Sequence, residues 1–153
     1  MKKLAFILPF LVTSCASIDT SAKWQAESNK GNAHILVFRE EGSHSSALPM
    51  YFGPDDYYVL KLNERQYSKF DLTEGSYKFR VNTHASKSST VNVNLEAKGT
   101  ICVEGSANPN AWFSAIFPPL IPFIPSFNVN IVKCPTQSTL AKMTPVTMGK
   151  QED

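Results

Sequence analysis

The clearest pattern along the chain is a strict alternation of apolar and polar residues at positions 77–82 and 91–96. Because successive side chains of a strand point to opposite faces, each segment is predicted to be a strand with one buried face and one wet face. Residues 34–39 carry apolar side chains on both parities, which predicts a central strand covered on both faces. No segment after the first 14 residues shows a sustained helical period, so the pattern predicts an all-β domain.

Shorter apolar runs complete this pattern, and turn residues separate them. Gly75 lies in one such turn and is expected to adopt a positive φ. Seven or eight short strands at this spacing are typical of an antiparallel β-sandwich or a small barrel, and we expect the sandwich. The further strands are expected at residues 48–52, 57–62, 67–72, 100–104 and 127–133, with turns at 53–56, 63–65, 74–76 and 97–99.

The chain starts with a different pattern, two lysines followed by the apolar residues 4–12. This is typical of a secretory signal peptide, and the run is too short for a membrane span, which needs about 20 residues. It ends in Val12-Thr13-Ser14-Cys15, which resembles the lipobox of bacterial lipoproteins. The resemblance implies that the leader is cleaved before Cys15 and that Cys15 carries the lipid, a stable anchor when several acyl chains are attached. The alternative is an ordinary signal peptide with an incidental cysteine.

The residue after the lipobox cysteine is Ala16 rather than aspartate. Among lipoproteins of enteric bacteria, aspartate at this position retains the protein in the inner membrane. The resemblance therefore implies an outer-membrane lipoprotein that faces the periplasm, with retention in the inner membrane or display at the cell surface as alternatives.

The domain organisation follows from these patterns. We expect a signal peptide at residues 1–14, a lipidated N-terminus and polar tether at 15–32, one β-sandwich at 33–145 and a flexible tail at 146–153. Without the two lysines of the leader, the 15 basic residues fall to 13, which equals the 13 acidic residues. A nucleic-acid partner requires a clustered basic patch, so this class of partner is excluded.

Three short motifs within the predicted sandwich point to a family. Leu-Val-Phe-Arg at 36–39, Leu-Asn-Glu at 62–64 and the segment Phe-Asp-Leu-Thr-Glu-Gly-Ser-Tyr at 70–77 resemble the DUF2846 group of bacterial β-sandwich proteins and the related PEGA-type repeat. The resemblance covers residues 34–104. It implies a β-sandwich that is frequently lipidated, and it implies no catalytic residue.

If Cys15 carries lipid, two cysteines remain, Cys102 and Cys134. An even pair in an oxidising compartment favours a disulfide. Both lie on the parity opposite to the apolar residues of their strands, so a bond is feasible if the two strands are neighbours. The alternative is two free, buried cysteines.

The most unusual segment is the apolar insert at residues 111–127, which contains four prolines. Prolines remove backbone donors and clash with a helix, so neither a transmembrane helix nor a central strand is expected. Three interpretations remain: a loop whose aromatic side chains complete the core, an exposed surface that contacts a partner or the membrane, and the wall of an apolar ligand pocket. The candidate contact residues are Trp112, Phe113, Phe117, Leu120, Ile121, Phe123 and Ile124.

Catalytic and metal-binding motifs are missing from the sequence. His34, His44 and His84 are scattered, and Asp55-Asp56 follows Gly-Pro in a predicted turn. We therefore expect no enzyme, no metal and no cofactor, but a non-catalytic binding or assembly module of the cell envelope. A protein partner would bind through the insert. The alternatives are a structural accessory subunit of a secretion or envelope complex and a carrier of an apolar ligand.

Overall fold

The structure is a computed structural model and describes residues 30–42, 48–54, 58–83 and 86–148. The lipobox with Cys15 lies outside the described residues, as does the tether up to residue 29. His44, His84 and the Asp55-Asp56 pair also lie outside them, so the expectations for these residues stay predictions.

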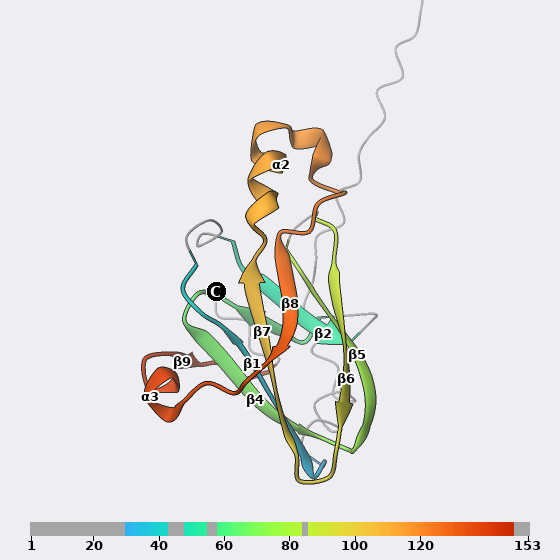
Figure 1. The fold of residues 1–153 in the computed structure, drawn as a ribbon, viewed down its shortest axis with the longest axis vertical. Helices are drawn as coiled ribbons and strands as arrows, with labels where there is room; N and C mark the ends of the chain where they lie inside the picture. Colours follow the sequence, from blue (N-terminus) through green and yellow to red (C-terminus); the bar gives the residue numbers. More distant parts are fainter. Residues whose placement is uncertain (1–29, 43–47, 55–57, 84–85, 149–153) are drawn as a thin grey trace, which may run out of the picture.

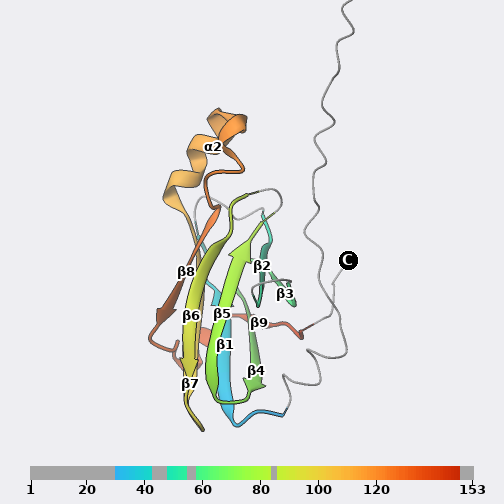
Figure 2. The same cartoon turned by 90° about the vertical axis from the view of Figure 1, so that its right-hand side faces the viewer.

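The described residues form nine strands in two facing sheets, which confirms the all-β sandwich (Figures 1 and 2). The five-stranded sheet has the order β8-β7-β1-β4-β9 and the four-stranded sheet the order β3-β2-β5-β6. The strands are β1 (Ala33–Arg39), β2 (Met50–Pro54), β3 (Leu60–Leu62), β4 (Gln66–Leu72), β5 (Gly75–Asn82), β6 (Ser89–Leu95), β7 (Thr100–Ala107), β8 (Phe127–Val132) and β9 (Thr144–Pro145).

Most strand pairs are antiparallel, as expected, but β1 with β7 and β4 with β9 are parallel. Parallel neighbours need a long crossover, and between β1 and β7 the chain passes through the whole four-stranded sheet. The register of β1 on β7 pairs His34 with Thr100 and Phe38 with Glu104. The start of β1 therefore lies at the end of the sandwich from which β7 departs, and the insert that follows β7 lies at the opposite end.

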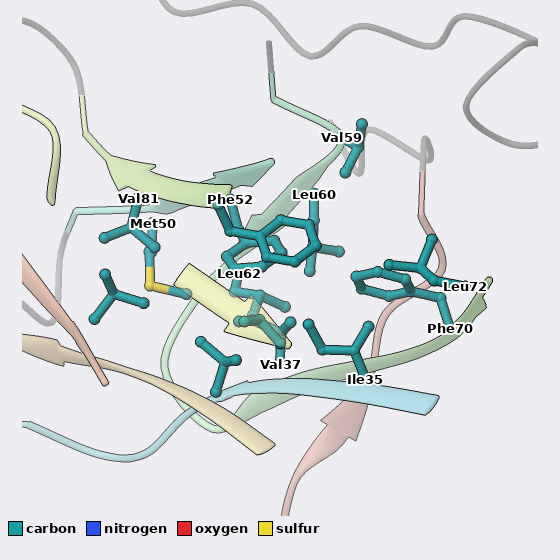
Figure 3. Close-up of a cluster of buried hydrophobic side chains, with 14 of the residues drawn as sticks. Ile35, Val37, Met50, Phe52, Val59, Leu60, Leu62, Phe70, Leu72 and Val81 are labelled. Atoms are coloured by element: carbon teal, nitrogen blue, oxygen red, sulfur yellow. The ribbon is translucent and has the colours of Figure 1, made fainter. Parts of the chain in front are cut away.

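The two sheets pack across one apolar core (Figure 3). Phe52 of β2 and Phe79 of β5 are fully buried, and their stacked ring centroids are 4.9 Å apart. Ile35 and Val37 of β1 belong to the same cluster, so this parity of the strand faces the core. The other buried members are Ala33, Met50, Val59, Leu60, Leu62, Phe70, Leu72, Val81, Val93, Leu95, Val103, Phe127 and Val129.

The outer face of β1 is buried as well. Leu36, Phe38 and Cys102 form a second, smaller cluster on the far side of the five-stranded sheet. Leu140 and Met143 pack against it from the C-terminal segment, which contains the short helix α3 (Gln137–Leu140). This confirms that residues 34–39 form a central strand covered on both faces.

Turns and ends refine the predicted boundaries. Gly75 has a φ of +148°, which confirms the expected positive φ at this turn. Val146 and Met148 pack partly buried against the main core, so ordered packing extends past the predicted start of the tail at residue 146. β9 is short and was not expected, because two residues are too few for a period to show.

Candidate contact surface at the end of the sandwich

Residues 108–126, between β7 and β8, project beyond the end of both sheets; we call this segment the tip (Figures 1 and 2). The last β7–β8 pair, Ala107 with Phe127, marks its base. It contains the 3-10 turn η1 (Pro109–Ala111), the helix α2 (Trp112–Ile116) and the 3-10 turn η2 (Pro118–Leu120). The tip thus comprises nearly all of the predicted insert and three residues before it.

The insert contains short helical turns, which the sequence pattern did not predict. α2 forms because its five residues contain no proline, and it ends at Phe117, directly before Pro118 and Pro119. Pro109 and Pro118 occupy first-turn positions of the 3-10 helices, where a missing N–H has no cost. At five residues, α2 is too short for a helical period to appear in the sequence.

Asn108 joins the two ends of the tip by hydrogen bonds; we call these bonds, together with the Lys87–Pro125 bridge, the fastening. Its backbone N–H donates to the Ser126 carbonyl at 2.9 Å, and its side-chain amide donates to the Pro125 carbonyl at 2.7 Å. The amide oxygen accepts from the N–H of Asn110 at 3.0 Å and caps η1. Lys87, next to β6, forms a parallel bridge with Pro125. These contacts join the two ends of the tip and attach the returning end to the four-stranded sheet.

Five large apolar side chains of the tip are exposed. Exposed fractions are 69% for Ile116, 58% for Phe117 and 70% for Phe123, against 48% for Trp112 and 46% for Phe113. The rings of Trp112 and Phe113 stack with centroids 3.9 Å apart. The interpretation in which the aromatic side chains of the insert complete the core is therefore wrong for all of them except Phe127, which is buried.

The structure places all seven candidate contact residues on this one projection. Trp112, Phe113, Phe117 and Phe123 are exposed, whereas Leu120, Ile121 and Ile124 are half-buried. Sequence reasoning missed the exposed Ile116 as a candidate contact residue, and it missed the role of Asn108 at the base of the tip. The Asn-Pro pair at 108–109 could have indicated the second, because asparagine before proline often starts a turn.

A hollow of about 90 Å³ lies below the base of the tip, at the C-terminal ends of β1 and β7. Its charged lining consists of Glu40, Glu41, Glu64 and Glu104 with Arg39. Burial, with a smaller contribution from Glu40, raises the pKa of Glu104. In the described part of the chain, no group of three or more His, Cys, Asp or Glu side chains is placed to hold a metal ion.

Arg39 stabilises the fold beside this hollow. It is almost fully buried, and its guanidinium donates to the carbonyls of Leu48 at 2.5 Å and Leu62 at 3.4 Å. Glu64 lies 3.9 Å away, and the guanidinium stacks 4.7 Å above the centre of the Phe127 ring. Burial lowers the pKa of Arg39, and Glu64 acts in the opposite direction. The residue thus links both sheets to the base of the tip.

The predicted cysteine pair is confirmed. Cys102 of β7 and Cys134, two residues past the end of β8, form a disulfide with a Cα–Cα distance of 5.1 Å. Because Cys102 belongs to the outer cluster, the bond ties the segment after β8 to the five-stranded sheet.

His34, the histidine that the structure describes, does not join the hollow or the tip. Its Nδ1 lies 2.5 Å from Asp71 Oδ1 across the β1–β4 pair, and both side chains are partly exposed. No helix within the described ranges has the length and the apolar composition needed to cross a membrane.

Comparison of the chain with protein-family models, with curated proteins and with solved structures finds no match.

Proposed function

We propose that the protein is a lipid-anchored lipoprotein of the bacterial cell envelope, and that its β-sandwich is a non-catalytic binding or assembly module. The observation that carries the proposal is the tip, because it exposes five large apolar side chains at one end of a well-packed domain. Contiguous exposed apolar surface usually marks an interaction site. The lipobox at Cys15 supplies the attachment that brings this surface to the envelope.

The disulfide supports the same compartment. Disulfides persist in oxidising environments such as the bacterial periplasm and are rare in the cytosol. The Cys102–Cys134 bond therefore agrees with a leader that exports the chain. With Ala16 after the cysteine, the proposed location is the outer membrane, facing the periplasm.

Metabolic labelling with a fatty-acid analogue tests the anchor. The full chain should incorporate label and sediment with membranes, and the Cys15→Ala variant should incorporate none. Cys134→Ser is the matched control, because it removes another cysteine and should leave labelling unchanged. Labelling that persists in Cys15→Ala, or no labelling of the wild type, would refute the proposed anchor.

Crosslinking in cells tests the module. A variant in which Trp112, Phe117, Ile121 and Phe123 are all serine should keep its fold, since the structure leaves these side chains outside the core. It should lose the contacts of the wild type with its surroundings in the envelope. A folded variant that keeps every contact would remove the tip from the function.

A further inference from the structure

The tip differs from the rest of the surface in carrying no charge. Between Glu104 and Lys133 the sequence contains no Asp, Glu, Lys, Arg or His. The tip is the middle of this interval. It therefore offers no charge that could form an ion pair with a partner or be attracted to an anionic surface.

The returning half of the tip, residues 117–125, also pairs its backbone donors internally. Residues 118, 119, 122 and 125 are prolines and have no N–H. The other residues between 117 and 125 each donate their backbone N–H to a carbonyl inside the tip, at 2.9–3.1 Å. These donors are Phe117, Leu120, Ile121, Phe123 and Ile124. The hydroxyl of Ser114 donates to the carbonyl of Ala111. Such internal pairing meets, for the N–H groups, the condition that hydrocarbon imposes on a polypeptide.

A protein partner would require a surface with more groups that form hydrogen bonds. Protein interfaces carry about one hydrogen bond per 100–200 Å². The far end of the tip presents apolar side chains, and the backbone N–H groups of residues 117–125 are paired, which suits a medium that accepts no hydrogen bonds. Trp112 lies one helical turn nearer the base than Ile116, and tryptophan prefers the headgroup level of a bilayer.

The chain outside the structure is long enough for the tip to reach the membrane that holds Cys15. Because β1 and β7 are parallel, Ala33 lies at the end of the sandwich opposite to the tip (Figure 2). β7 spans about 23 Å, and η1 with α2 adds at most about 13 Å. The 15 residue steps from Cys15 to Lys30, the first described residue, reach at most about 50 Å, so the tether can run back along the domain with length to spare.

We propose that the tip inserts into the lipid leaflet in which Cys15 is anchored, so that the sandwich stands tip-down on the membrane. Ile116, Phe117 and Phe123 enter the acyl region, Trp112 lies among the headgroups, and the turn between β6 and β7 points away from the bilayer. This inference rests on the proposed function only for the lipid anchor at Cys15, because the tip itself binds the lipid surface.

The fluorescence of Trp112 tests the insertion. In a Trp24→Phe background, Trp112 is the remaining tryptophan of the chain. The mature chain from Cys15 onward is coupled through Cys15 to a maleimide-bearing phospholipid in phosphatidylcholine vesicles; Cys102 and Cys134 are bonded to each other and do not compete. Trp112 emission should shift to shorter wavelength and be quenched by lipids brominated on their acyl chains.

Two variants serve as matched controls. With Ile116, Phe117 and Phe123 changed to serine, the inserted fraction should fall at least about tenfold, with the unfolding transition unchanged. With Ala97→Trp in a Trp24→Phe, Trp112→Phe background, the reporter lies in the exposed turn between β6 and β7 and should be neither shifted nor quenched. Added phosphatidylglycerol or salt should not change Trp112 quenching, because the tip is uncharged.

Unshifted and unquenched Trp112 emission in the coupled protein would overturn the insertion, and so would quenching of the tryptophan at position 97 instead. If Trp112 stays unquenched while a photocrosslinker at Phe117 captures one defined protein in cells, the tip binds a protein; if it captures a second copy, the tip is a dimer contact. Since coupling to the vesicle does not depend on acylation in the cell, a protein that cells leave unlabelled refutes the natural anchor and not the insertion.

Discussion

The core of the sandwich and the tip contain the same kinds of side chain, but these are buried in the core and exposed in the tip. Phe52 and Phe79 are fully buried, whereas Phe117 and Phe123 are mostly exposed. In the core, strands from two sheets present their apolar faces to each other, so every phenylalanine has partners on several sides. In the tip, no second layer formed by the described residues covers the short helix and its return segment. Apolar composition therefore predicts burial only where a facing element exists.

The fastening at the base maintains this difference. A loop of this composition could fold back over the sandwich and hide its aromatic side chains. Asn108 instead joins the ends of the tip through Ser126 and Pro125, and the Lys87–Pro125 bridge fixes the returning end. Residues on both sides of the tip are thus committed to the sheets, and the apolar side chains are held away from the core.

The largest effect is expected in the core. Phe52→Ala should lower the free energy of unfolding by about 3–5 kcal/mol, because it leaves a cavity beside Phe79 between the two sheets. Phe117→Ala, the matched change in the tip, should alter it by less than about 0.5 kcal/mol. Urea denaturation measures both. Similar losses for the two variants would break the comparison, because the tip would then be part of the packed unit.

The disulfide is expected to have the second largest effect. Cys134→Ser should cost about 3 kcal/mol of unfolding free energy, because the bond closes a loop with a sequence separation of 32 that carries the tip. This variant keeps the buried Cys102 in place, so the packing of the outer cluster is little changed. Reductant should lower the stability of the wild type to that of the variant and leave the variant unaffected. A loss smaller than about 1 kcal/mol would contradict the prediction.

Loosening the fastening should have an intermediate effect. Asn108→Ala removes two side-chain hydrogen bonds at a buried position and should cost about 1–2 kcal/mol. Amide hydrogen exchange should accelerate at Phe117, Leu120 and Ile121 more than in β1, because the tip opens before the core. The exposed neighbour Asn110→Ala is the control. Uniform acceleration across the domain would show that the tip and the body unfold as one unit.

Removing the apolar surface of the tip should hardly change stability. The triple change of Trp112, Phe117 and Phe123 to serine should alter the unfolding free energy by less than about 0.5 kcal/mol, since these side chains belong to neither core cluster. Binding of a fluorescent hydrophobic dye to the folded protein should fall. Leu60→Ser is the contrasting change in the core and should destabilise strongly. Unchanged dye binding by the triple variant would contradict the exposed placement.

The smallest effect concerns the hollow between the two regions. Because the pKa of Glu104 is raised in the folded protein, the folded state keeps this proton over a pH range in which the unfolded chain has lost it. The contribution of Glu104 to stability should therefore fall as pH rises from its unfolded pKa through its folded pKa. Glu104→Gln should gain stability relative to wild type over this interval. Denaturation between about pH 4 and 7 measures the difference.

Glu40→Gln is the control for Glu104. It removes the smaller, electrostatic cause of the shift and should reduce the difference between Glu104→Gln and its parent without abolishing it. If the relative gain of Glu104→Gln instead declines as pH rises, the direction of the pKa shift is contradicted.

Local patterns were sufficient for much of the fold. The alternation at 77–82 and 91–96 predicted β5 and β6, and the doubly apolar run at 34–39 predicted the central position of β1. These predictions succeed because a strand with one facing layer and a strand with two leave different periods in the sequence. The parallel pairing of β1 with β7 left no such signal, because strand direction depends on the route of the chain and not on the composition of either strand.

The candidate site was predicted as a segment but not as a shape. Its apolar composition and its prolines marked residues 111–127 as unusual, and the contact residues were chosen from that segment. The helical turn of α2, the role of Asn108 and the exposure of Ile116 depend on contacts between residues far apart in the chain, such as Asn108 with Pro125. Short elements have no period, and long-range hydrogen bonds have no local signature.

The sequence by itself determined the longer strands and the positive φ at Gly75, because each depends on neighbouring residues or on residue chemistry alone. Only the tertiary structure decided that Cys102 and Cys134 meet, that the tip lies at the end opposite to Ala33, and that its aromatic side chains face outward. The physical reason is that burial and proximity are properties of facing elements. A phenylalanine is equally apolar in both places, and what surrounds it is decided by the path of the whole chain.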